Sequence, residues 1–141
     1  MHEADKLATI VGEWVAKAEG DLKTAAHTLK LASQCPTDIV AFHAQQCVEK
    51  YIKAMLVALR VDFPKIHDIR RLVEMLPPAN RPSLSVNEQN MLTPYAAEAR
   101  YPGDSLPISL PEARRAVAVA RRVRKEIRAM LPPPALRKHR R

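Results

Sequence analysis

A few cationic and titratable side chains near the expected helix ends could act on a phosphate. Lys50 and Lys53 lie within the stretch 42–59, FHAQQCVEKYIKAMLVAL, while His67 and Arg100 follow later in the chain. Lysine and arginine can bind a phosphate through their charge, and histidine, whose pKa is near neutrality, can transfer a proton. If these side chains meet, they form a cleft with phosphate-binding cations and a titratable imidazole.

Each of these residues also has an ordinary structural interpretation. The lysines of the long helix are typical of surface ion pairs, Arg100 can cap a helix end, and His67 can be a turn residue. Similarly, Tyr51 and Tyr101 are more typical of a core or an interface than of a platform for base stacking. His43 on the long helix is more typical of a packed or interface histidine than of a ligand.

The sequence predicts no metal centre and no cofactor. Its five histidines show no paired ligand spacing, and its two cysteines support neither a disulfide framework nor a metal site. No glycine-rich phosphate loop is present, which leaves little support for a conventional ATP site.

The positive charge of the chain is concentrated at its end. Residues 1–110 carry 12 Lys/Arg against 13 Asp/Glu, a balance of −1, whereas residues 111–141 carry 11 against 2, a balance of +9. A local basic surface suggests a polyanion or an acidic protein partner, although a solvated helix face with a basic tail would look the same. On the last helix, a basic stripe runs through Arg114, Arg121, Lys125 and Arg128.

The elements that position these residues are helices. Apolar residues recur at steps of three and four, which predicts helices over about residues 5–32, 38–60, 67–76, 85–100 and 109–131. Capping-box patterns mark two starts, at Ser85 and Ser109, and Pro94 predicts a kink or a restart. We therefore expect an all-α, up-and-down bundle of four core helices plus a short additional helix. It would occupy residues 1–131, with a disordered basic tail over 132–141.

Four stretches occur in a familiar order: WVAKAEGDLKTA (14–25), FHAQQCVEKYIKAML (42–56), FPKIHDIRRL (63–72) and YAAEARYPGD (95–104). Together they resemble the small stand-alone prokaryotic branch of the HEPN domain family (higher eukaryotes and prokaryotes nucleotide-binding), over roughly residues 14–131. The resemblance implies a helical bundle that is usually a homodimer. Such proteins are often encoded beside a minimal nucleotidyltransferase, and some of these pairs are toxin–antitoxin systems.

Ribonuclease members of that family resemble one another in an Arg-(four to six residues)-His motif and need no metal. Here Arg60 and His67 have six residues between them, but they straddle the loop before the short third helix, whereas the family motif lies later in the domain. Arg100 is nearer the expected region but has no histidine following at that distance. The candidate catalytic residues are therefore His67 and Arg100, and the candidate nucleotide or phosphate contacts are Lys50, Lys53, Arg100, Tyr101 and Asp104.

Two functions remain open from the sequence. The first is a cytoplasmic, homodimeric nucleotide- or RNA-binding component of a toxin–antitoxin-like pair with a minimal nucleotidyltransferase, which would be a metal-independent endoribonuclease if it is an enzyme. The second is a non-enzymatic dimeric protein-interaction module that uses the basic last helix. The chain shows no membrane span and no signal-peptide core.

Overall fold

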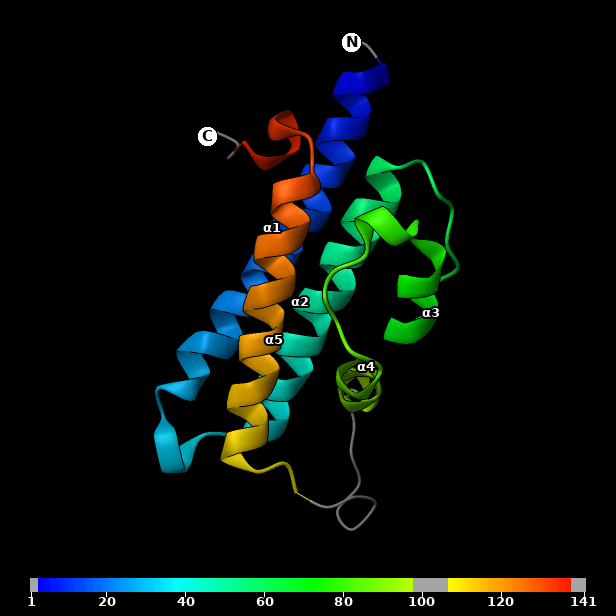
Figure 1. The fold of residues 1–141 in the computed structure, drawn as a ribbon. Coiled ribbons are helices and arrows are strands. Elements are labelled where there is room, and N and C mark those ends of the chain that lie inside the picture. Colours follow the sequence, from blue (N-terminus) through cyan, green and yellow to red (C-terminus); the bar gives the residue numbers. More distant parts are fainter. Residues whose placement is uncertain (1–2, 98–106, 138–141) are drawn as a thin grey trace.

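The computed structural model describes residues 3–97 and 107–137, which form a helical bundle (Figure 1). Its helices are α1 (Glu3–Leu29), α2 (Thr37–Ala58), α3 (Ile69–Met75), α4 (Val86–Leu92) and α5 (Leu110–Met130). Short 3-10 turns lie at Ala32–Gln34, Pro78–Asn80, Thr93–Ala96 and Pro133–Leu136. The predicted all-α bundle is confirmed, and none of the described helices is long and apolar enough to cross a membrane.

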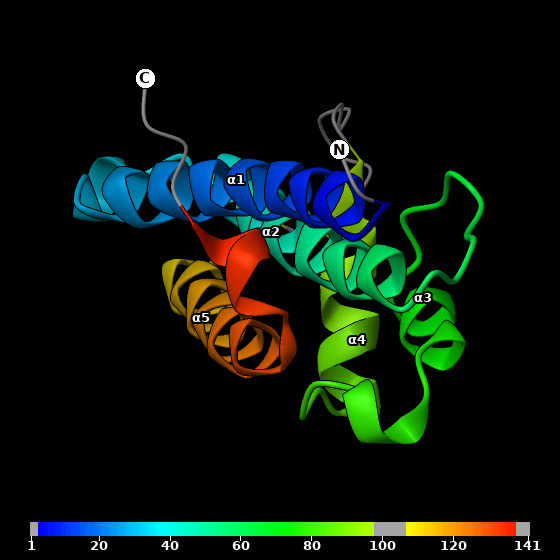
Figure 2. The ribbon, with the colours of Figure 1, turned by 90° about the horizontal axis from the view of Figure 1, so that it is seen from above.

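Helix α2 is the central element. Viewed from above, α1 covers one side of it, while α3, α4 and α5 cover the other (Figure 2). Its apolar residues at three- and four-residue steps, including Val48, Tyr51, Ile52 and Met55, are buried. Because α2 is surrounded, even polar positions on it become buried, and this is what creates the site described below.

The two short helices begin at side-chain caps. The carboxylate of Asp68 accepts a hydrogen bond from the Arg71 backbone N–H at 3.2 Å. Ser85 and Glu88 form the predicted capping box, in which each side chain accepts from the other residue's backbone N–H. The Glu88 carboxylate also accepts from Arg122, which ties α4 to α5.

The fourth helix is shorter than the sequence suggested. It ends at Leu92, and the chain restarts at once as the 3-10 turn Thr93–Ala96, in agreement with the expected break at Pro94. Proline lacks the N–H that would continue the helical hydrogen bonds.

The expected disorder of residues 132–141 needs correction over its first part. Residues Pro133–Leu136 form an ordered turn against α1, and Ala135 is buried. The turn can approach because α1 has Gly12 there: an added Cβ would lie 3.0 Å from the Ala135 carbonyl oxygen. Residues 138–141 lie outside the described part of the chain.

Candidate functional site

Glu49 of α2 is a buried carboxylate held by three donors. Its side chain lies 2.9 Å from Nζ of Lys53, 3.0 Å from Nε2 of Gln45 and 2.9 Å from Nδ1 of His67. Gln45, Glu49 and Lys53 follow one another at four-residue steps and therefore share a helix face. His67 comes from the connection between α2 and α3, so the site joins two segments of the chain.

The imidazole of His67 is fixed on one side and open on the other. Its side chain is 64% exposed, whereas that of Glu49 is only 3% exposed. In the tautomer in which Nδ1 donates to the Glu49 carboxylate, Nε2 faces away from it as a proton acceptor. This is the arrangement that a histidine acting as a general acid or base requires.

The segment that carries His67 is anchored at two further points. Gln45 donates to the backbone carbonyl of His67 at 3.3 Å. Earlier in the segment, Phe63 packs edge-on against Trp14 of α1, with ring centroids 6.1 Å apart. The position of the imidazole is therefore set by α1 and α2 and not by the connection alone.

Lys53 is a buried counter-ion of Glu49. Its side chain is 7% exposed, and its ammonium lies 5.8 Å from the Trp14 ring centroid and 5.7 Å from that of Phe63. A cation in this position compensates the buried carboxylate and gains cation–π attraction. This burial argues against the predicted phosphate contact by Lys53 and gives it a positioning role beside His67.

Lys50 belongs to a different cluster, on the α1 side of α2. Its Nζ lies 2.6 Å from Oδ2 of Asp21, and His43 Nδ1 lies 2.8 Å from Oδ1 of the same carboxylate. Asp21 is buried, and the Lys50 side chain is 22% exposed. The structure thus supports the interpretations of Lys50 as an ion-pair residue and His43 as a packed histidine.

The remaining predicted contacts cannot be placed. Arg100, Tyr101 and Asp104 lie outside the described residues. Arg60 is described and does not join His67: its guanidinium points to Glu3, at 3.9 Å. Since Glu49 and Ala58 are about 13 Å apart along α2, the end of that helix is remote from the carboxylate that holds His67.

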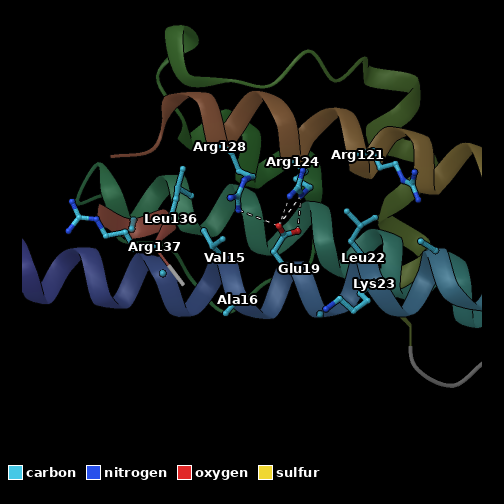
Figure 3. Close-up of a pocket in the computed structure, with 14 residues that line it drawn as sticks. Val15, Ala16, Glu19, Leu22, Lys23, Arg121, Arg124, Arg128, Leu136 and Arg137 are labelled. Carbon is cyan, nitrogen blue, oxygen red and sulfur yellow. Dashed lines mark hydrogen bonds and ion pairs between the residues drawn. The ribbon is translucent and has the colours of Figure 1, made fainter. Parts of the chain in front are cut away.

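The sequence did not reveal a basic groove between α1 and α5, which the C-terminal turn closes at one end (Figure 3). Its volume is about 900 Å³. The charged residues that line it are Glu19, Lys23, Arg121, Arg124, Arg128 and Arg137. The basic stripe of the last helix indicated two of these arginines, but the residues from α1 and the turn join them only in the folded chain.

A network centred on Glu19 organises this groove. Arg124 donates to both carboxylate oxygens of Glu19, at 2.8 to 2.9 Å, and Arg128 donates to it at 3.3 Å. Burial raises the pKa of Glu19, but the hydrogen bonds and charge of Arg124 outweigh this effect and hold the pKa below its usual range. Burial raises the pKa of the neighbouring Tyr51 phenol, which stays neutral.

No group of three or more potential metal-ligating side chains occurs among the described residues. The side chains gathered around the Glu49 carboxylate are the imidazole of His67, the ammonium group of Lys53 and the amide of Gln45.

Comparison with known proteins gives a consistent family. The model of the HEPN domain matches residues 11–130. The crystal structure of TT1696 from Thermus thermophilus superposes with a TM-score of 0.73 at 24% identity, covering 87% of this chain and 99% of that chain. The structure of ST0689, an archaeal HEPN homologue, gives a TM-score of 0.65 at 22% identity, covering 86% and 98%. No curated protein matches. Because the family model covers most of the chain, this protein belongs to the HEPN domain family.

Proposed function

We propose that this protein is a cytoplasmic nucleotide- or RNA-binding component of a toxin–antitoxin-like pair, with a minimal nucleotidyltransferase as its partner. Membership of the HEPN domain family supports this proposal. We further propose that it works as a homodimer and as a metal-independent endoribonuclease. The observation that carries the catalytic part is the exposed imidazole of His67, held through Nδ1 by the buried carboxylate of Glu49.

In the proposed reaction, Nε2 of His67 takes the proton of an RNA 2′-hydroxyl. The 2′-oxygen then attacks the adjacent phosphorus, and the bond from phosphorus to the 5′-oxygen breaks. The leaving oxygen takes up a proton from water, and the imidazolium releases its proton to the solvent. The products are a 2′,3′-cyclic phosphate and a 5′-hydroxyl, so no oxidant or metal is required. Glu49 orients the imidazole and stabilises its protonated form.

Charge accumulates on the phosphate during this reaction and needs a cation. Lys53 is buried and paired with Glu49, so it cannot meet the phosphate directly. We assign this role to Arg100, in agreement with the sequence prediction, and expect it to act as an electrostatic stabiliser.

The test is expression of the protein alone and with a neighbouring nucleotidyltransferase, scored by growth arrest and integrity of total RNA. Both His67→Ala and Arg100→Ala should remove toxicity. His67→Ala should lower RNA cleavage by about 10²- to 10⁴-fold, the usual contribution of general acid–base catalysis, and Arg100→Ala by about 10²- to 10³-fold, the usual loss for one electrostatic donor. His43→Ala is the matched control, because it removes another carboxylate-paired histidine. Cleavage that persists in both the His67 and Arg100 variants would refute this site.

A further inference from the structure

The groove between α1 and α5 is a second functional surface, separate from His67. Five cations line it, Lys23, Arg121, Arg124, Arg128 and Arg137, against one acid, Glu19, which gives it a net charge of +4. The connection that carries His67 and helix α5 lie on opposite sides of the molecule (Figure 2). A ligand bound at the His67 site therefore does not account for the positive charge of the groove.

The cations form a row along the groove. Figure 3 shows Arg137, Arg128, Arg124 and Arg121 in sequence from one end to the other. Arg121 and Arg128 are seven residues apart on α5, a rise of about 10 Å, and a nucleic-acid strand stacked as in a duplex carries about one phosphate per 3.4 Å of axis. A row of this length matches a run of phosphates better than a single one.

The arginines keep donors for a ligand. Arg124 uses Nε and Nη2 on Glu19, and Arg128 uses Nη1 on Glu19 and Tyr51, so each retains further N–H groups. The side chains of Lys23 and Arg121 form no ion pair with another described residue. Arginine is the side chain best suited to bidentate phosphate recognition.

The apolar part of the lining argues against a protein partner. It consists of Gly12, Val15, Ala16, Gly20, Leu22, Ala26, Ala135 and Leu136. None of the exposed large hydrophobic residues lies in it, and neither does an aromatic ring. Protein interfaces usually depend on large apolar or aromatic anchors, and base recognition in single strands depends on stacking. What remains is charge and an aliphatic lining in which five of the eight residues are glycine or alanine, so a sugar–phosphate backbone can approach closely.

We infer that this groove binds the backbone of single-stranded RNA without sequence preference, as an anchoring surface outside the cleavage site. The choice of RNA among polyanions rests on the proposed function. The linear row of cations and an apolar lining made mostly of glycine and alanine are what make the groove suited to a strand.

The test is fluorescence anisotropy with a labelled single-stranded oligoribonucleotide at salt concentrations from about 50 to 200 mM. The double variant Lys23→Glu/Arg121→Glu should weaken binding about tenfold or more. It should also reduce the slope of log affinity against log salt by about 0.7 for each lost phosphate contact. The matched control, Lys30→Glu/Arg115→Glu, makes the same charge change at two exposed positions outside the groove. Lys30 directly follows α1, and Arg115 lies in α5. The control should stay within about twofold of the wild type, since it reports long-range charge alone.

Lys23→Gln/Arg121→Gln repeats the test with neutral side chains, in case charge reversal perturbs folding. Equal weakening in the control, or unchanged affinity in both groove variants, would overturn the inference. So would a salt-insensitive complex, or displacement of RNA by a poly-glutamate peptide but not by unlabelled RNA of another sequence. A further competition compares ATP with unlabelled RNA at equal phosphate concentration. Equal displacement of the labelled RNA by the two would assign the groove to nucleotides and overturn the assignment to a strand.

Cleavage of a dinucleotide separates this inference from the proposed function. A dinucleotide is too short to reach from His67 to the groove, so the groove variants should cleave it at the wild-type rate. If the wild type binds RNA through the groove but cleaves nothing, the groove stands and the ribonuclease proposal fails. If the wild type cleaves RNA through His67 while the groove variants bind RNA normally, the ribonuclease proposal stands and the groove inference fails.

Discussion

At the scale of single residues, every buried charge in the described site has a specific partner. Glu49 is matched by Lys53 and His67, and Asp21 by Lys50 and His43. A buried carboxylate without such partners would be neutralised by a proton, because desolvation penalises its charged form. The pairs therefore offset the desolvation of these carboxylates, each of which also holds one histidine, His67 or His43.

Glu19 makes the stability of the protein depend on pH. Its pKa is lowered in the folded state from the usual 4.5, so its ionised form is favoured by folding. The stabilisation is present above about pH 4.5 and is lost as the pH falls through the lower folded-state pKa. Glu19→Gln should cost about 1–2 kcal/mol at neutral pH, between the values for exposed and buried pairs. Urea unfolding at a series of pH values should show that the difference from the wild type shrinks below pH 4.5. A constant difference down to strongly acidic pH would contradict this reason.

Arg60 adopts a left-handed backbone conformation, with φ at 59°. It follows α2 in a Schellman motif: the Val61 N–H donates to the Leu56 carbonyl at 2.9 Å, and the Arg60 N–H donates to the Val57 carbonyl at 3.0 Å. Glycine fits this conformation without the steric cost that a Cβ brings. Arg60→Gly should therefore stabilise the protein by about 0.5–1 kcal/mol in urea unfolding. Arg60→Ala removes the same exposed side chain but keeps the Cβ, so it should give no such gain. An equal gain in both variants would mean that the arginine side chain, and not φ, is responsible.

At the scale of elements, α1 is shaped by what packs against each of its faces. Its buried residues face α2, its Glu19 meets α5, and its Gly12 receives the C-terminal turn. The turn closes one end of the basic groove, so a small residue on α1 helps to define a surface whose arginines come from α5 and the C-terminal segment.

The two glycines of α1 should respond oppositely to alanine. Gly20 has no neighbouring atom within 4 Å of an added Cβ, so Gly20→Ala should gain about 1 kcal/mol from helix propensity alone. At Gly12 the added Cβ meets the Ala135 carbonyl at 3.0 Å, so Gly12→Ala should lose that gain or destabilise the protein. Thermal unfolding measures both changes. Equal stabilisation by the two substitutions would show that the turn of residues 133–136 can move away from α1 without lowering the stability of the protein.

At the scale of the whole molecule, one domain carries two separate surfaces. The His67 site lies where α2 meets the following connection, and the basic groove lies between α1 and α5 (Figures 1 and 2). Because α2 separates them, a substitution in one surface should leave the other intact, which is the basis of the tests above.

We predict that the protein is a homodimer in solution. The described residues place one cation, Lys53, in the Glu49 site, and it is engaged internally. A cleft shared by two chains would bring a second set of His67 and Arg100 to the same RNA. Sedimentation at roughly tens of micromolar should show a dimer, with the monomer appearing on dilution. A monomer throughout that range would count against a shared cleft.

The sequence by itself determined the helical fold and several of its helix boundaries. Apolar spacing placed the long helices, and local signals placed Ser85 as a cap and the break at Pro94, because such signals act over a few residues and need no tertiary partner. Family membership also followed from the sequence, through four short stretches in order. The sequence did not determine that the segment after Leu131 returns to α1, since a turn of small and apolar residues has no strong local signal.

Only the tertiary structure decided what the polar residues do. Lys50 and Lys53 are equivalent in a helical pattern, yet one pairs with Asp21 on the α1 side and the other is buried with Glu49 beneath two aromatic rings. Periodicity carries no information about the Asp21 partner of Lys50, which lies 29 residues away in the sequence. It is compatible with the Lys53–Glu49 pair, four residues apart on one helix, but it does not show that this pair is buried. His67 was recognised as a candidate from its type and position. Its buried carboxylate partner, like the groove of arginines, arises from the packing of helices around α2.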